Sequence, residues 1–190
     1  MIKCRFVKEL DRLKKSSSES IDNIITFDAF KRYMHVVRNV EIDLKDTIRS
    51  VNQAGQKTLI LLCGSAGDGK SHLLSYLKNA DTEHLIDDYI IYNDATESSE
   101  PLKTAIDTLN DLLDEFKDRN LNRPGKNIIL AINLGVLSNF IESAYGKDYS
   151  LLKAFVMDHQ ILGTNSNHNY DHTVPYFRSI SFSDYHMFSL

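Results

Sequence analysis

The sequence predicts a three-layer α/β domain with a mostly parallel sheet, preceded by a helical lead-in. Two apolar runs, at 59–63 and 128–132, have the length and composition of strands buried on both faces. Helical patterns separate these runs, and strands that alternate with helices favour parallel pairing. No strand pattern precedes residue 59, so we divide the chain into a helical segment at 1–56 and a sheet domain at 57–190.

Size and composition are those of one ordinary globular domain. The chain has 190 residues, 42% hydrophobic and 25% charged, which is enough to bury a full core. No apolar run approaches the length of a membrane span, and the first residues do not form a signal peptide. The only cysteines are Cys4 and Cys63, and burial of Cys63 at a strand end would disfavour a disulfide between them. We therefore expect a cytoplasmic protein without membrane contact.

The charge is unevenly distributed along the chain. The net charge of −4 does not indicate nucleic-acid binding by the chain as a whole. Residues 1–15, however, contain six basic side chains against two acidic ones. Two interpretations remain open: a solvated amphipathic helix with Phe6, Leu10 and Leu13 turned inward, which the pattern favours, or a basic arm that touches DNA.

The lead-in is expected to be helical throughout. A short helix at 3–15 is followed by a polar break, and then by two helices at about 27–36 and 39–52. Thr26 is placed to cap the first helix of this pair, and Gly55 is placed to end the second.

Two more strands complete the expected sheet. The aromatic and β-branched run at 89–92 predicts one of them, and the run at 176–182 predicts the last. The chain ends eight residues after Phe182, so we expect further sequence to complete the domain. Helices are expected at about 71–78, 135–144 and 149–160. A further helix is expected to end at about Phe116, with Ser98 or Ser99 as its cap and Pro101 in its first turn.

One short motif carries most of the functional information. Residues 64–71 spell G-x-x-x-x-G-K-S, the phosphate-binding loop of P-loop nucleoside triphosphatases. An apolar strand precedes the motif and a helical pattern follows it, which is the context that the motif requires. The sequence therefore predicts a P-loop NTPase-like domain that binds ATP with Mg²⁺.

Each part of this motif has a role in holding a polyphosphate. The glycines let the backbone curl closely around the anion, and the helix that follows adds N–H donors and the positive end of its dipole. Lys70 is expected to contact the β- and γ-phosphates as a catalytic residue, and Ser71 is expected to ligate Mg²⁺. The expected nucleotide site consists of Gly64, Ser65, Ala66, Gly67, Asp68, Gly69, Lys70, Ser71 and His72.

Two members of this site are less readily assigned. A carboxylate at Asp68 would repel a triphosphate, and it is tolerable if its side chain points to solvent. His72 faces either the nucleotide or the helix packing, and the sequence does not decide between them.

A charged residue is missing where a P-loop ATPase normally has one. The buried strand at 128–132 ends in Asn133, whereas an Asp there would orient Mg²⁺ through water. Asn133 supplies no charge and no base, so only a weak metal contact is expected from it. Asp94 and Glu97, just past the second strand, are the preferred catalytic substitutes, with Asp94 contacting Mg²⁺ through water. Asp184, past the last strand, is a third candidate; alternatively, each of these carboxylates only caps a turn.

Four stretches of the chain, taken in order, resemble one family: 59–74, 93–98, 130–137 and 180–185. On these stretches, the chain from about residue 20 onward resembles the F subunit of the DNA phosphorothioation-dependent restriction system (DptF). Together they are far more particular than the phosphate-binding motif, which occurs in hundreds of families. Members of that family are longer than this chain.

The resemblance implies a role in bacterial defence. In such systems host DNA carries sulfur in place of a non-bridging phosphate oxygen, and the F, G and H components attack DNA that lacks this mark. The implied partners are the G and H components and DNA, which is contacted directly or through them. The resemblance also implies that residues 64–71 bind the nucleotide and that Asn133 belongs to the family pattern. It does not specify whether this subunit hydrolyses ATP.

Two other functions remain open on the sequence. A scaffold that binds ATP without turnover is favoured by Asn133, and a P-loop phosphotransferase is compatible with the motif. The second normally needs a basic lid over the phosphates, but basic residues are sparse after the third strand. Our expectation is therefore an ATP-binding, weakly or conditionally hydrolysing subunit of a restriction complex.

Overall fold

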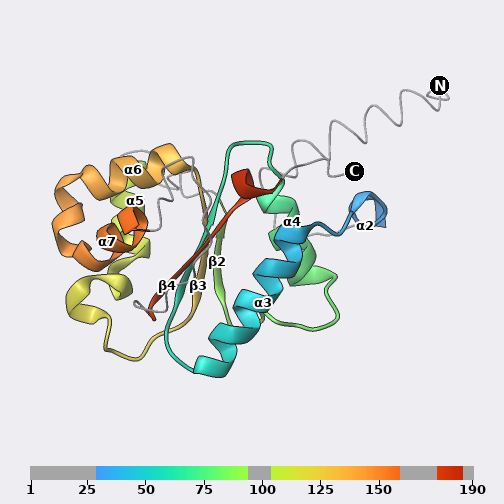
Figure 1. Cartoon of the computed structure of the whole chain (residues 1–190), viewed down its shortest axis with the longest axis horizontal. Helices are drawn as coiled ribbons and strands as arrows, with labels where there is room; N and C mark the ends of the chain where they lie inside the picture. The colour runs from blue at the N-terminus through green and yellow to red at the C-terminus, as the bar shows by residue number, and fades with distance from the viewer. Residues whose placement is uncertain (1–28, 94–103, 159–174, 186–190) are drawn as a thin grey trace, which may run out of the picture.

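The computed structural model describes residues 29–93, 104–158 and 175–185. Within these segments, helices and strands alternate around one sheet (Figure 1). The elements are α2 (Ala29–Met34), α3 (Asn39–Ala54), β1 (Leu59–Cys63), α4 (Lys70–Asn79), β2 (Ile90–Asn93), α5 (Ala105–Leu112), β3 (Ile128–Ile132), α6 (Leu134–Glu142), α7 (Ser150–Asp158) and β4 (Phe177–Ser181).

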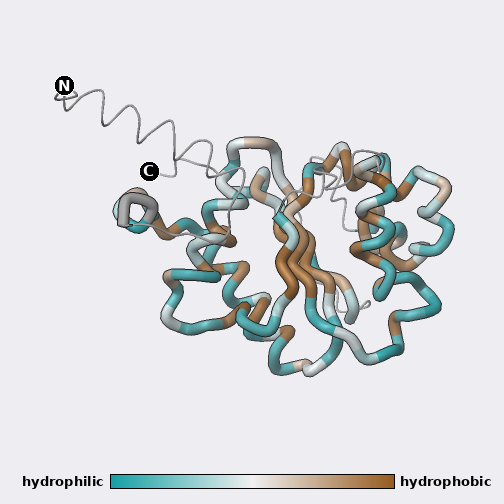
Figure 2. Tube along the Cα trace, turned by 180° about the vertical axis from the view of Figure 1, so that it is seen from behind, coloured by the Kyte–Doolittle hydropathy of each residue, from teal (hydrophilic) through white to brown (hydrophobic). Residues whose placement is uncertain are grey.

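The sheet has four strands in the order β2-β3-β1-β4, and every pair is parallel. Leu59 of β1 is level with Ile128 of β3 on one side and with Phe177 of β4 on the other. All residues of β1 and β3 are buried, which is why the two runs are apolar without alternation. Figure 2 shows the same concentration of apolar residues along the strands. The predicted α/β class with parallel pairing is confirmed.

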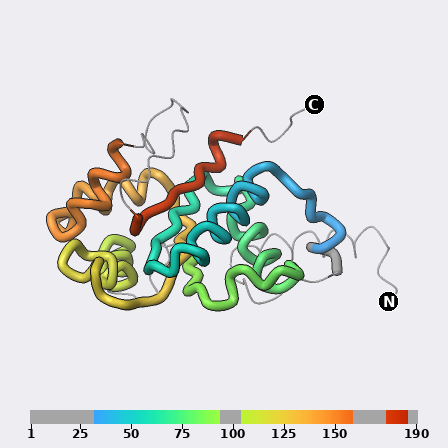
Figure 3. The backbone as a smooth tube through the Cα atoms, turned by 60° about the horizontal axis from the view of Figure 1, so that its bottom comes forward, coloured from blue at the N-terminus to red at the C-terminus, as the bar shows by residue number. Residues whose placement is uncertain are grey.

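Helices cover both faces of the sheet, so the described part of the chain forms three layers (Figure 1). Ile60 and Leu62 of β1 pack with α3 and α4, whereas Leu59 and Leu61 pack with α5, α6 and α7. Figure 3 shows α3 lying beside β4. The chain thus passes its first helices over one face of the sheet and its later helices over the other.

Helix α3 belongs to this packing although it precedes the first strand. Leu44 and Ile48 are fully buried against the sheet. Gly55 ends the helix in the left-handed conformation (φ 63°), as expected from the sequence. Helix α2 ends at Met34, two residues earlier than expected, and 35–38 has no regular structure. The helix expected at 3–15 and the cap expected at Thr26 lie outside the described residues.

Helix α5 begins later than the sequence suggested. Its cap is Thr104, whose side chain accepts a hydrogen bond from the Asp107 N–H while the Asp107 carboxylate accepts from the Thr104 N–H. This reciprocal capping box satisfies two backbone donors at once, which neither serine alone would do. Ser98, Ser99 and Pro101 lie outside the described residues.

No helix in the described segments is long and apolar enough to cross a lipid bilayer.

Packing of α3 on the sheet predicts a large stability difference between two substitutions in that helix. Leu44→Ala should lower the free energy of unfolding by about 2–5 kcal/mol, because it leaves a cavity in the core. Ile42→Ala, at a side chain that is 48% exposed, should change it by no more than about 0.5 kcal/mol. Urea titrations followed by circular dichroism measure both. Equal effects would contradict the packing of α3 described above.

Candidate nucleotide-binding site

The carboxyl ends of the four parallel strands lie at one edge of the sheet. Gly64 follows β1, Asn93 ends β2, Asn133 follows β3 and Asp184 lies three residues past β4. Ligands of open α/β sheets bind outside this edge. The arrangement brings most of the residues selected from the sequence to one side of the molecule.

A glycine loop, Gly64–Gly69, connects β1 to α4. The Gly64 N–H donates to the carbonyl of Ile132, which anchors the loop to the end of β3. Gly67 and Gly69 have φ values of 89° and 92°, a region that residues with a Cβ rarely occupy. Gly69 is also the N-cap of α4 and supplies no side-chain acceptor to its first turn. Such a glycine-capped helix start is the usual setting for an anion.

Lys70 lies against the backbone of this loop. Its Nζ donates to the carbonyl oxygens of Gly64 at 2.9 Å and Ser65 at 2.8 Å. Below the loop, burial raises the pKa of the Cys63 thiol to about 12, an effect that the Lys70 charge opposes and the Asp184 charge reinforces. The thiol is therefore protonated at neutral pH, and Cys63 is a free, buried cysteine as expected.

The side chain of Asp68 folds back onto the backbone of the loop, in a contact that is exposed to solvent. Its Oδ2 accepts a hydrogen bond from the Ser65 N–H at 2.5 Å. The backbone dipole of the loop therefore offsets part of the carboxylate charge. A Cβ on Gly64 would lie 2.6 Å from this Oδ2, so the close approach requires glycine at position 64.

Ser71, in the first turn of α4, is held by the end of β2. Its hydroxyl donates to Oδ1 of Asn93 at 2.8 Å. The strand end that faces the motif serine is therefore that of β2, the strand directly followed by Asp94. Asn93 carries no charge, and the charged residue Asp94 follows it directly, so the sequence alone does not single it out. A polar residue that closes an apolar strand pattern was the available signal.

Asn133 caps the helix that follows β3. Its Oδ1 accepts from the Gly135 N–H at 2.8 Å, which places it as the N-cap of α6. A weak contact of Asn133 with metal stays a prediction. Asp94 and Glu97 lie outside the described residues, and Asp184 is exposed in the turn after β4.

Two residues just before α3 contact the glycine loop and α4. Both terminal nitrogens of Arg38 donate to the Asp68 carbonyl at 3.1 Å, and the guanidinium lies over the Phe182 ring. His35 Nδ1 lies 3.2 Å from His72 Nε2. His72 thus contacts the lead-in through its ring. No sequence motif marks Arg38 or His35, because their contacts depend on the packing of α3 beside α4.

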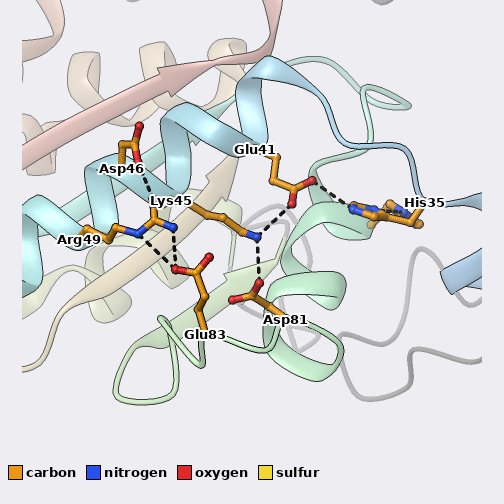
Figure 4. A network of polar contacts seen from close by, with 8 residues as sticks. His35, Glu41, Lys45, Asp46, Arg49, Asp81 and Glu83 are labelled. Atoms are coloured by element: carbon orange, nitrogen blue, oxygen red, sulfur yellow. Dashed lines mark hydrogen bonds and ion pairs between the residues drawn. The ribbon is translucent and has the colours of Figure 1, made fainter.

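A buried chain of charged groups, the polar seam, joins α3 to α4 and to the residues that follow α4. It consists of His35, Glu41, Lys45 and Asp81 (Figure 4). Lys45 Nζ lies 3.2 Å from Glu41 and 2.8 Å from Asp81. Burial alone would lower the pKa of Lys45, but hydrogen bonds to the two carboxylates outweigh it and raise the pKa. Lys45 therefore remains charged, and its single positive charge is shared between the two carboxylates of the seam.

The residues around the glycine loop fit a magnesium nucleotide. Mg²⁺ usually takes one or two protein ligands and completes its shell with phosphate oxygens and water. Ser71 would supply a hydroxyl oxygen to the metal, and Lys70 would supply a positive charge to the phosphates. Among the described residues there is no group of three or more His, Cys, Asp or Glu side chains that could hold a metal ion.

Comparisons with known proteins add no assignment to this site. No family model, no curated protein and no solved structure matches the chain.

The Ser71–Asn93 contact predicts how magnesium should affect nucleotide affinity in two variants. Asn93→Asp places a carboxylate on the Ser71 hydroxyl, and its charge should strengthen Mg²⁺-dependent ATP binding by about threefold to tenfold. Asn93→Leu, of similar size, should weaken it because Ser71 loses its acceptor. Calorimetric titration at several Mg²⁺ concentrations measures both effects. An unchanged magnesium dependence in both variants would remove Asn93 from the site.

Proposed function

We propose that this chain has a P-loop NTPase-type fold, binds ATP with Mg²⁺ at residues 64–71 and serves as a subunit of a phosphorothioation-dependent DNA restriction complex. The proposal that the chain binds a nucleotide rests on three groups that lie together. The positive-φ glycine loop, Lys70 on its backbone and Ser71 bonded to Asn93 all meet at one helix start. A structural turn between a strand and a helix would need none of these three together.

The roles of the two side chains follow from their contacts. Lys70 would exchange its bonds to loop carbonyls for phosphate oxygens, which accept more strongly because they are charged. The Ser71 hydroxyl donates a hydrogen bond to Asn93, so its oxygen lone pairs remain available to a metal ion. When bound, Mg²⁺ would supply positive charge to the β- and γ-phosphates.

Exposed apolar side chains in the segment that leads to Arg38 favour a nucleotide over inorganic polyphosphate. Val36 and Val37 are 73% and 60% exposed, and they directly precede Arg38, which contacts the glycine loop. A nucleobase needs apolar surface to leave water. These valines offer such a surface in the segment whose Arg38 contacts the loop.

Hydrolysis by the isolated chain is expected to be weak. Asn93 occupies the position beside Ser71 where a charged acceptor would assist the metal, and an amide is not a base. A general base must therefore come from Asp94, Glu97 or a partner. This arrangement supports ATP turnover that depends on assembly.

The place in a restriction complex rests on the resemblance to the DptF family. On that basis the partners are the G and H components and DNA, and the complex works in the cytoplasm. The nucleotide state of this subunit would then control assembly or attack on DNA that lacks the sulfur mark. A second candidate, a scaffold that binds ATP without turnover, is favoured by the neutral amide at Asn93.

Loss of the Lys70 ammonium should abolish nucleotide binding. We expect Lys70→Ala to weaken Mg²⁺-ATP affinity by at least about a hundredfold, because its charged bonds to phosphate are lost. Lys78→Ala, at an exposed lysine near the end of the same helix, should bind like the unmodified chain. Calorimetry gives the affinities, and phosphate release on the same samples gives the turnover. If the unmodified chain binds neither ATP nor ADP, the proposed site is wrong.

Partners should control turnover. We expect little phosphate release from the isolated chain, and stimulation by DNA only when the G and H components are present. DNA that carries phosphorothioate should stimulate less than unmodified DNA. Rapid turnover by the chain alone, unaffected by DNA and partners, would count against the restriction role. Absence of turnover under all conditions, with retained binding, would favour the scaffold.

A further inference from the structure

We propose that Asp68 positions the phosphate-binding backbone of the glycine loop, and that Arg38 holds Asp68 in place from outside the loop. The inference rests on the proposed nucleotide site and gives a role to an acidic residue in a loop built for anions. Asp68 has three polar groups, its N–H, its carboxylate and its C=O, and each of them has a partner among the described residues. Asp68 and Arg38 act through the backbone, and neither side chain is required to touch phosphate.

The carboxylate and the N–H of Asp68 close the first turn of the loop. Its Oδ2 accepts from the Ser65 N–H at 2.5 Å, and the Asp68 N–H donates to the Ser65 carbonyl at 3.4 Å. Ser65 and Asp68 are therefore joined by two hydrogen bonds across the turn. Gly67, which lies between them, has a φ of 89°, so the closed turn needs glycine at this position. The loop is thus closed by one of its own side chains.

The bond to the Ser65 N–H also orients the peptide between Gly64 and Ser65. In a trans peptide the N–H and the C=O point in opposite directions, so a carboxylate on the Ser65 N–H turns the Gly64 carbonyl to the other side. The Lys70 Nζ donates to that carbonyl at 2.9 Å. Asp68 and Lys70 therefore hold one peptide from its two sides, and the carboxylate sets where the lysine rests.

Arg38 holds the peptide that follows Asp68. Both terminal nitrogens of its guanidinium donate to the Asp68 carbonyl at 3.1 Å, and the guanidinium lies 5.1 Å from the centroid of the Phe182 ring. The Asp68 carbonyl shares its peptide with the Gly69 N–H, which this bond turns away from Arg38. That N–H belongs to the backbone that cradles phosphate in the motif. A Cβ on Gly69 would lie 3.0 Å from Arg38 Nη2, so glycine at position 69 also makes room for the guanidinium.

The property that the loop needs from Asp68 is a hydrogen-bond acceptor rather than a charge. The negative charge of the carboxylate repels phosphate, whereas its oxygen closes the turn. Asparagine has nearly the same shape and keeps one oxygen acceptor without the charge. Alanine removes both the acceptor and the charge. The two substitutions therefore separate positioning from repulsion, because both would strengthen nucleotide binding if Asp68 only repelled the ligand.

The test compares nucleotide affinity in matched variants at neutral pH. Mg²⁺-ADP is titrated calorimetrically into the unmodified chain, Asp68→Asn, Asp68→Ala and Asp88→Ala. Asp68→Ala should weaken binding about threefold to tenfold, the size expected for one lost hydrogen bond, although it removes a repulsive charge. Asp68→Asn should bind at least as tightly as the unmodified chain. Asp88 is exposed and lies just before β2, at the opposite edge of the sheet, so Asp88→Ala should bind normally.

Arg38 is tested by the same titration, alone and together with Asp68. Arg38→Gln should weaken binding about threefold to tenfold, because the Asp68 carbonyl loses its two donors. Arg32→Gln, at an exposed arginine of α2, is the control and should bind normally. The double variant Arg38→Gln/Asp68→Ala should lose less affinity than the product of the two single losses, because both substitutions release the same loop. Losses that multiply fully would overturn the proposed link between Arg38 and Asp68.

A measurement without nucleotide separates positioning from a general loss of folding. Amide hydrogen exchange, followed by nuclear magnetic resonance, should show a faster Ser65 amide in Asp68→Ala and an unchanged one in Asp68→Asn. The Leu61 amide, in the centre of the buried strand β1, should exchange at the same rate in both variants, which would show that the sheet is intact.

The outcomes distinguish this inference from the nucleotide site on which it rests. If Asp68→Ala binds Mg²⁺-ADP as tightly as the unmodified chain, or more tightly, the positioning role is wrong and the site stands. An Asp68→Asn variant as weak as Asp68→Ala would also overturn the role, since the acceptor would then not suffice. Absence of nucleotide binding by the unmodified chain would overturn both proposals.

Discussion

The central strand β1 has no exposed side chain, and the rest of the structure is arranged to keep it so. A parallel strand in the middle of a sheet needs an apolar cover on both faces, and here α3 and α4 provide one cover while α5, α6 and α7 provide the other. Because β1 lies between β3 and β4, its carboxyl end opens between two other strand ends. The glycine loop starts at that point, so its position is fixed by the burial of the strand beneath it.

The polar seam sets how the first two helices on this face meet. Two buried carboxylates without a cation would cost several kcal/mol, so Glu41 and Asp81 are tolerated only with Lys45 between them. The requirement holds α3 at one position along α4. His35 and Arg38, which directly precede α3, are thereby delivered to the start of α4 and to the loop. Compensation of charge in the polar seam thus supports the positions of His35 and Arg38 at the start of α4 and at the glycine loop.

The sequence predicted features that depend on neighbours along the chain. Burial of β1 and β3 followed from continuous apolar runs, and the end of α3 followed from Gly55. Features that depend on distant residues were missed. Asn93 meets Ser71 because β2 lies beside β3 and beneath α4, and no local pattern contains that strand order.

The start of α5 differs from the expected one because two candidate cap signals lie close together in the sequence. The serines before Pro101 outweighed the weaker-looking Thr104 and Asp107, yet the reciprocal box at Thr104 caps the helix. The fold-back of Asp68 depended on a carboxylate finding a backbone N–H three residues earlier, which a charge argument alone does not reveal. Asp94 and Glu97, preferred on sequence grounds, lie outside the described residues.

Cys63 has a chemical consequence for the loop that it precedes. Oxidants and alkylating reagents react with the thiolate form of cysteine. A thiol with a pKa of about 12 is almost entirely protonated at neutral pH, so very little thiolate is present. An exposed cysteine directly before the glycine loop would be open to oxidation by peroxide. Here burial protects Cys63, so its modification would require local opening of the carboxyl end of β1. The rate of its labelling would then record how often the sheet edge opens beneath the loop.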